Sequence, residues 1–119
     1  MSGFQEVAKT DELKDGTLKK VTLGGREILL ARAGNSYFAA DNRCPHLSGD
    51  LSRGTLNGTV VTCPLHRSRF DLKDGKVVRW TDFTGLKLSA ATLLKKPRPL
   101  TTHQVKVEGN GIFVAVKEG

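Results

Sequence analysis

Cysteine and long apolar runs are both scarce in this chain of 119 residues. Its two cysteines are Cys44 and Cys63, and a lone disulfide would be an unusual device in a cytosolic protein of this size. The longest apolar runs, such as residues 28–31, are far too short to cross a bilayer, and residues 1–9 lack the basic and then apolar pattern of a signal peptide. We therefore expect no membrane span and a cytoplasmic location.

Aromatic residues are also few, which bears on whether the positive charge indicates binding to nucleic acid. The formal net charge is +7, but the single Tyr37 and the single Trp80 are far apart and no basic run is interleaved with aromatics. We therefore expect no nucleic acid among the partners. Two interpretations of the charge stay open: steering toward an acidic protein partner, and a solvated surface of scattered lysines.

Turn signals divide much of the chain into hairpins. Hydrophobic residues make up 38% of the chain and charged residues 26%, as in a folded domain. The expected strand pairs are residues 19–23 with 26–32, 26–32 with 37–41, 69–72 with 76–80, and 104–108 with 112–117. Their turns are Gly24-Gly25, residues 33–36, Asp74-Gly75 and residues 109–111. Four such turns predict an antiparallel all-β domain.

The domain organisation follows from the segments between these hairpins. Residues 42–68 are rich in Gly, Ser, Asn and Pro and contain one expected strand, 59–62, so they indicate an inserted subdomain. The remainder, about 1–41 and 69–119, forms the basal β-domain, and 1–119 is one domain.

The stretch from 81 to 103 is hard to interpret. It predicts a loop with one short helix at most, because Pro97 and Pro99 end any longer helix. We expect His103 to face solvent at the start of a strand, and Trp80 to pack against the core or an edge.

Each cysteine is followed at once by proline and, within three residues, by histidine. Cys44 and His46 form a C-x-H pair, and after 16 intervening residues Cys63 and His66 form a C-x-x-H pair. Thiolates and imidazoles at this spacing suit a tetrahedral zinc or an iron–sulfur centre, since one loop can then present two ligand atoms to a single site. The four residues alone leave both open, and a structural zinc domain for protein contacts is one alternative.

The segments CPHLSGDLSRG and CPLHRSRFD together resemble the Rieske-type ferredoxin signature. The resemblance extends over essentially the whole chain, through the strand at residues 69–71, the hairpin at residues 74–76 and the stretch at residues 97–100. It implies a Rieske-like antiparallel β-sandwich or barrel with an inserted cluster-binding subdomain. It also implies one [2Fe–2S] cluster per chain, with Cys44 and Cys63 on the buried iron and His46 and His66 on the outer iron.

The resemblance also assigns residues around the cluster. Hydrophobic side chains would shield it from water, prolines would stiffen the turns, and backbone N–H groups would donate to cluster sulfurs. Ser68 falls at the position of a serine whose hydroxyl donates a hydrogen bond to the cluster in respiratory members. The cofactor-binding residues implied in this way are Leu47, Gly49, Pro64, Leu65 and Ser68.

Four positions depart from the respiratory or common pattern. Gly49 and Leu65 stand where respiratory members have an additional cysteine pair, so no disulfide locks the two loops. Phe70 replaces a tyrosine donor, which predicts a reduction potential near the low end of the Rieske range, about −150 mV. Arg67 replaces a common glycine after the second histidine; it is either a docking residue or an ordinary solvent-facing arginine.

The function implied by the resemblance is one-electron transfer, without catalysis by the chain itself. Electrons would pass from a flavin- or nicotinamide-dependent reductase to a terminal oxygenase that docks transiently at the tip formed by His46 and His66. A looser resemblance, to the small subunit of assimilatory nitrite reductases, gives an alternative. Some of those subunits lack the ligands, and the presence of all four here favours the carrier.

Overall fold

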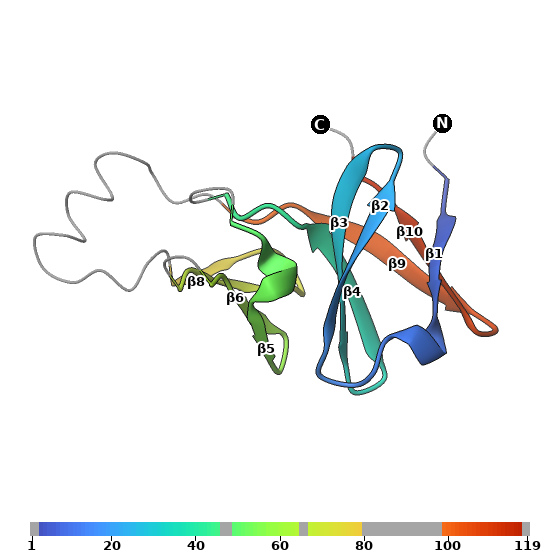
Figure 1. The fold of residues 1–119 in the computed structure, drawn as a ribbon, viewed down its shortest axis with the longest axis horizontal. Coiled ribbons are helices and arrows are strands. Elements are labelled where there is room, and N and C mark those ends of the chain that lie inside the picture. Colours follow the sequence, from blue (N-terminus) through green and yellow to red (C-terminus); the bar gives the residue numbers. More distant parts are fainter. Residues whose placement is uncertain (1–2, 46–48, 65–66, 80–98, 118–119) are drawn as a thin grey trace, which may run out of the picture.

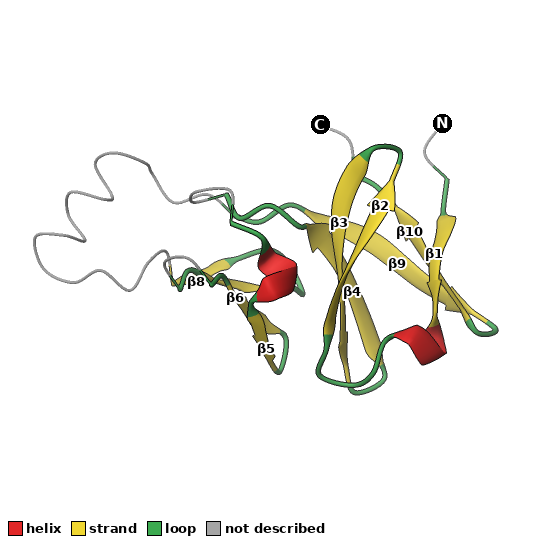
Figure 2. Ribbon diagram, in the orientation of Figure 1, coloured by secondary structure: helices red, strands yellow, loops and turns green. Residues whose placement is uncertain are grey.

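The computed structural model describes residues 3–45, 49–64, 67–79 and 99–117 (Figure 1). Among these residues, the regular structure is strands and two single-turn 3-10 helices (Figure 2). The strands are β1 (Gln5–Lys9), β2 (Leu18–Leu23), β3 (Arg26–Ala33), β4 (Ser36–Asp41), β5 (Thr55–Asn57), β6 (Val60–Thr62), β7 (Arg69–Asp71), β8 (Val77–Arg79), β9 (Thr102–Glu108) and β10 (Gly111–Ala115). The helices are η1 (Thr10–Glu12) and η2 (Leu51–Arg53). The predicted all-β fold is confirmed.

Six strands form the larger sheet, in the order β1-β10-β9-β4-β3-β2, with all neighbours antiparallel. The hairpin between β2 and β3 turns at Gly24 and Gly25, whose φ angles of 59° and 80° lie in the region that glycine adopts without strain. The edge strands β1 and β2 approach each other, so the sheet is nearly closed into a barrel (Figure 1). Its interior is a core that includes Ile28, Leu30 and Ile112.

Four strands form the smaller sheet, in the order β5-β6-β7-β8, which lies beside the larger one (Figure 1). Its pairing sets an apolar row of side chains side by side, from Leu56 through Val61 and Phe70 to Val77. These residues pack in a second core with residues of β3 and β4, among them Leu29. Strand β3 is therefore buried on both faces, because alternate residues point into the barrel and toward the smaller sheet.

Strand pairing differs from the expected pattern in three places. Strands β1 and β5 were not predicted from the sequence. The hairpin of β7 and β8 was expected in the larger domain, but β7 pairs with β6 in the smaller sheet. The apolar row explains this difference, since Phe70 and Val77 continue the buried face begun by Leu56 and Val61. The predictions for Trp80 and for residues 81–98 lie outside the described residues.

The prediction for His103 was wrong. Its side chain is fully buried, and its Nε2 lies 2.9 Å from Oδ1 of Asp41 on the neighbouring strand β4. Its Nδ1 accepts a hydrogen bond from the backbone N–H of Lys117 at 3.0 Å. Because Lys117 supplies a donor to Nδ1, the ring proton on Nε2 is the one that Asp41 accepts.

No helix within the described ranges is long and apolar enough to span a membrane.

Candidate metal centre

The fold brings the two cysteines into one core although they come from different loops. Cys44 follows β4 and Cys63 follows β6, and their exposed fractions are 1% and 2%. Both belong to the core between the two sheets, together with Leu51 and Phe70. A thiolate in such apolar surroundings is unfavourable unless a cation neutralises it. Two buried sulfurs in one apolar core therefore fit a metal centre.

The two cysteine loops are closed in the same way. The backbone N–H of Cys44 donates to the carbonyl of Gly49, and that of Cys63 donates to the carbonyl of Ser68, each at 2.8 Å. In both loops the bond joins a cysteine to the residue five positions later. Each loop therefore starts at a buried cysteine and is closed five residues later by a backbone hydrogen bond to that cysteine.

The predicted site residues divide into two groups. His46, Leu47, Leu65 and His66 lie outside the described residues, so the structure does not place them. Of the others, Gly49 and Ser68 are buried and Pro64 is exposed. The described residues therefore include the two thiols and the backbone hydrogen bonds that close both loops.

Arg67 has a backbone conformation that is rare for its residue type. Its φ of 59° is the only positive value among the described residues other than glycine, and its N–H donates to the carbonyl of Cys63 at 3.1 Å. The loop therefore follows the left-handed path that glycine adopts without strain. The arginine side chain is exposed.

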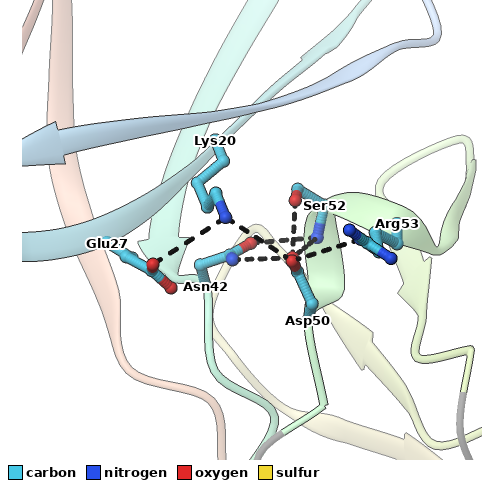
Figure 3. A network of polar contacts seen from close by, with 6 residues as sticks. All are labelled: Lys20, Glu27, Asn42, Asp50, Ser52 and Arg53. Atoms are coloured by element: carbon cyan, nitrogen blue, oxygen red, sulfur yellow. Dashed lines mark hydrogen bonds and ion pairs between the residues drawn. The ribbon is translucent and has the colours of Figure 1, made fainter.

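A polar network anchors the first cysteine loop (Figure 3). Oδ1 of Asp50 accepts hydrogen bonds from the side-chain amide of Asn42 at 2.7 Å, and from the hydroxyl of Ser52 at 2.5 Å and its N–H at 3.1 Å. Oδ2 lies 3.6 Å from the ammonium of Lys20 on β2 and 3.7 Å from Nε of Arg53. Asp50 thus caps η2 and ties the loop to the larger sheet.

Asn42 supports the same loop from its other end. The side chain is buried, and its Oδ1 accepts the N–H of Ser52 at 2.9 Å. Its backbone N–H donates to Glu27 on β3 at 3.2 Å, and its carbonyl accepts from Leu51 at 2.9 Å. Through these bonds Asn42 joins β3 of the larger sheet to the start of η2.

The network also changes the titration of Asp50. The Ser52 hydroxyl, followed by the Asn42 amide, the Lys20 charge and the Ser52 N–H, lowers the pKa of Asp50 below its ordinary value, although partial burial opposes the shift. Neither Asn42 nor Asp50 was predicted from the sequence as a residue of the site. The Asp-x-Ser pattern at residues 50–52 is a helix-capping signal that indicates Asp50, whereas Asn42 has no local signal because its side-chain partners are eight and ten residues away.

Comparison with known proteins identifies the family. The model of the Rieske [2Fe-2S] domain matches residues 3–96. The 3-phenylpropionate/cinnamic acid dioxygenase ferredoxin subunit of Photorhabdus laumondii is 33% identical over 113 residues, 94% of this chain and 93% of the relative. The ferredoxin component of the naphthalene 1,2-dioxygenase system of Pseudomonas aeruginosa is 29% identical over 103 residues, 87% of this chain and 86% of the relative.

Solved structures give the same result for the fold. The ferredoxin of carbazole 1,9a-dioxygenase from Nocardioides aromaticivorans IC177 matches with a TM-score of 0.78 and 30% identity, over 98% of this chain and 100% of that chain. A complex of reduced oxygenase and oxidised ferredoxin in carbazole 1,9a-dioxygenase matches with a TM-score of 0.74 and 25% identity, over 94% and 92%. The matches span the larger sheet and both cysteine loops, and they decide between zinc and an iron–sulfur centre. The chain belongs to the Rieske [2Fe-2S] domain family and carries one [2Fe–2S] cluster.

Proposed function

We propose that this protein is a one-electron carrier that moves electrons from a reductase to a terminal oxygenase. The observation that carries the proposal is the pair of buried cysteines at the start of two equivalently closed loops. The relatives named above are ferredoxin components of dioxygenase systems, and one similar structure is a complex of oxygenase and ferredoxin. These names support a carrier rather than the small subunit of a nitrite reductase.

The ligand assignment is part of this proposal. Cys44 and Cys63 would hold the inner iron, and His46 and His66 would hold the outer iron. When bound, the cluster supplies a site that accepts and returns one electron. The apolar side chains packed around both cysteines would exclude water from the sulfurs, and a partner would dock transiently at the imidazoles of His46 and His66.

The surroundings of the cysteines support a low reduction potential within the family. Phe70 is fully buried in the same core as both cysteines, and a phenylalanine has no hydroxyl to donate to a ligand sulfur. Fewer donors stabilise the reduced state less, so we place the potential near the low end of the Rieske range, at about −150 mV. Ser68, buried at the closure of the second loop, is the remaining hydroxyl donor in our assignment of cofactor-binding residues.

The domain boundaries and location complete the proposal. One Rieske domain spans residues 1–119, and its cluster-binding subdomain starts near residue 42, where β4 ends, and includes residues up to about 68. The protein works in the cytoplasm, where reduced cysteines are available for cluster assembly.

A redox titration of ligand variants tests this function. His46→Cys and His66→Cys each exchange a neutral imidazole for a thiolate, so each should keep iron and lower the potential. His103→Asn is the matched control, because His103 is bound to Asp41 and Lys117 and should leave the potential unchanged. Equal potentials for the ligand variants and the unmodified protein would contradict the assignment. A colourless protein with one zinc and no acid-labile sulfide would contradict the function itself.

A further inference from the structure

Positive charge is concentrated in the half of the molecule that holds the cysteines. Residues 42–79 contain seven lysines and arginines and three acidic residues. The described residues outside that segment, 3–41 and 99–117, contain eight basic and seven acidic residues. The larger sheet is therefore nearly balanced, and the smaller sheet with its loops carries a clear positive excess.

The acidic residues of this half are occupied within the fold. Asp50 holds the first cysteine loop through Asn42 and Ser52. Asp71 accepts hydrogen bonds from the hydroxyl of Thr59 and the N–H of Lys73, each at 3.0 Å. Asp74 accepts the N–H of residue 76 at 2.9 Å within the turn before β8. Asp50 also lies 3.7 Å from Nε of Arg53, and Asp71 lies 3.8 Å from the ammonium of Lys73, so two of the three carboxylates pair with other cations of this half.

Two of the arginines are paired on neighbouring strands of the smaller sheet. Arg69 on β7 is the direct partner of Arg79 on β8, and both are exposed. They continue the row of strand partners that begins with Thr55 and Thr62, and an irregularity in the register of β7 and β8 separates this pair from the buried pair of Phe70 and Val77. Like charges placed directly opposite in antiparallel strands destabilise the sheet. The pairing of Arg69 with Arg79 places two positive charges next to each other on the exposed side of these strands.

The arginine pair is close to the candidate metal centre. Arg69 immediately follows Ser68, whose carbonyl closes the loop of Cys63, and its other strand partner is Thr62, which precedes Cys63. Arg67, exposed and only two residues away in the same loop, is within about 7 Å along the chain. Among the described residues, Arg69 forms no ion pair. The charge thus lies at the base of the loop that contains His66.

We propose that the outer face of the smaller sheet around Arg69, Arg79 and Arg67 docks an acidic surface of the protein that exchanges electrons with the cluster. The proposal rests on the carrier function and adds the chemistry of the partner. Carboxylates from the partner would pair with these exposed arginine side chains, and the contact is placed beside the second cysteine loop. A surface held mainly by exposed charges forms and separates quickly, as a carrier requires.

Electron transfer to two acceptor proteins of opposite charge tests the proposal. The reduced holoprotein is mixed by stopped flow with plastocyanin, an acidic acceptor, and with cytochrome c, a basic one. The variant is Arg69→Glu, with Arg69→Gln as a milder form. The matched control is Lys14→Glu, because Lys14 is exposed in the segment between η1 and β2 and its replacement changes the net charge equally. Unchanged visible spectra establish that each variant keeps its cluster.

At low salt, Arg69→Glu should slow reduction of plastocyanin about fivefold more than Lys14→Glu does, and this difference should disappear at high salt. With cytochrome c, Arg69→Glu should be the faster of the two variants. Equal effects of the two variants on plastocyanin, or no effect of either, would overturn the docking face and leave the carrier function intact. Failure of the reduced protein to pass electrons to either acceptor or to ferricyanide would remove the function, and the docking face with it.

Discussion

The side-chain amide of Asn42 donates to the carboxylate of Asp50 at 2.7 Å, and this bond joins the two ends of the first cysteine loop. A backbone bridge between residues 43 and 50 closes the same loop, and Cys44 lies inside it. Cys44 therefore lies in a loop whose two ends are joined by a polar pair.

Replacing Asn42 with alanine should loosen this loop. The variant removes two hydrogen bonds of a buried side chain, one to Asp50 and one from Ser52, so we expect a loss of about 2 kcal/mol in the free energy of unfolding, measured by urea denaturation of the holoprotein. Release of iron to a chelator should also become faster. Asn35→Ala, at an exposed turn, is the control and should change the stability by less than about 0.5 kcal/mol. An iron release rate equal to that of the control would mean that the loop is held elsewhere.

The free energy of unfolding should decrease at acid pH as the carboxylates of Asp50 and Asp71 become protonated. The Lys73 N–H, followed by the Thr59 hydroxyl and the Lys73 charge, lowers the pKa of Asp71 against partial burial, and the pKa of Asp50 is lowered as described above. A carboxyl whose pKa is lower in the folded state contributes stability above its unfolded value of 3.8, and this contribution is lost as the pH falls through the folded value.

Asp71→Asn should therefore make the loss of stability below about pH 4 shallower than in the unmodified protein. Urea midpoints measured between pH 7 and pH 3 give the comparison, and Asp11→Asn at an exposed position is the control. Parallel pH profiles for the unmodified protein and Asp71→Asn would contradict this account.

Arg67→Gly should stabilise the second cysteine loop. Glycine adopts the φ of 59° without the steric cost of a side chain, but it also gains freedom in the unfolded chain. We expect a net gain of about 0.5 kcal/mol in thermal or urea unfolding, whereas Arg67→Val should lose more than about 1 kcal/mol because a β-branched residue is strained in this region. Equal stability of the glycine and valine variants would show that the loop avoids the left-handed conformation in solution.

The buried His103 should have one fixed tautomer. Because Lys117 donates to Nδ1, the ring proton is expected on Nε2, directed to Asp41. Nitrogen NMR of the ring measures this, and a proton on Nδ1 would contradict the arrangement. His103→Ala should cost about 2 kcal/mol in the free energy of unfolding, since it removes a hydrogen bond to a carboxylate and leaves a cavity.

The hairpins could be predicted because their signals are local. Gly24, Gly34, Gly75 and Gly109 each have a positive φ, and each lies in the segment between two paired strands. Strand β5 is only three residues long, and β1 shows no clear alternation of buried and exposed residues, so neither has a strong signal.

The residues that could not be predicted from the sequence are those whose roles depend on contacts with residues far away in the chain. The cysteines were indicated by their spacing from histidine and by the family resemblance. His103 was misjudged because its partner Asp41 is 62 residues away, and the anchoring role of Asn42 depends on strand β3 and helix η2. The positive φ of Arg67 agrees with the glycine that the family commonly has at this position.

The central claim is that two cysteines and two histidines share one [2Fe–2S] cluster. Pulsed EPR of the dithionite-reduced holoprotein tests it most directly, because nitrogen bound to iron couples to the unpaired electron. We expect couplings from two imidazole nitrogens, assigned to His46 and His66 and reduced to one in His66→Cys. A reduced cluster without nitrogen coupling, or a protein that holds zinc and gives no signal, would contradict it.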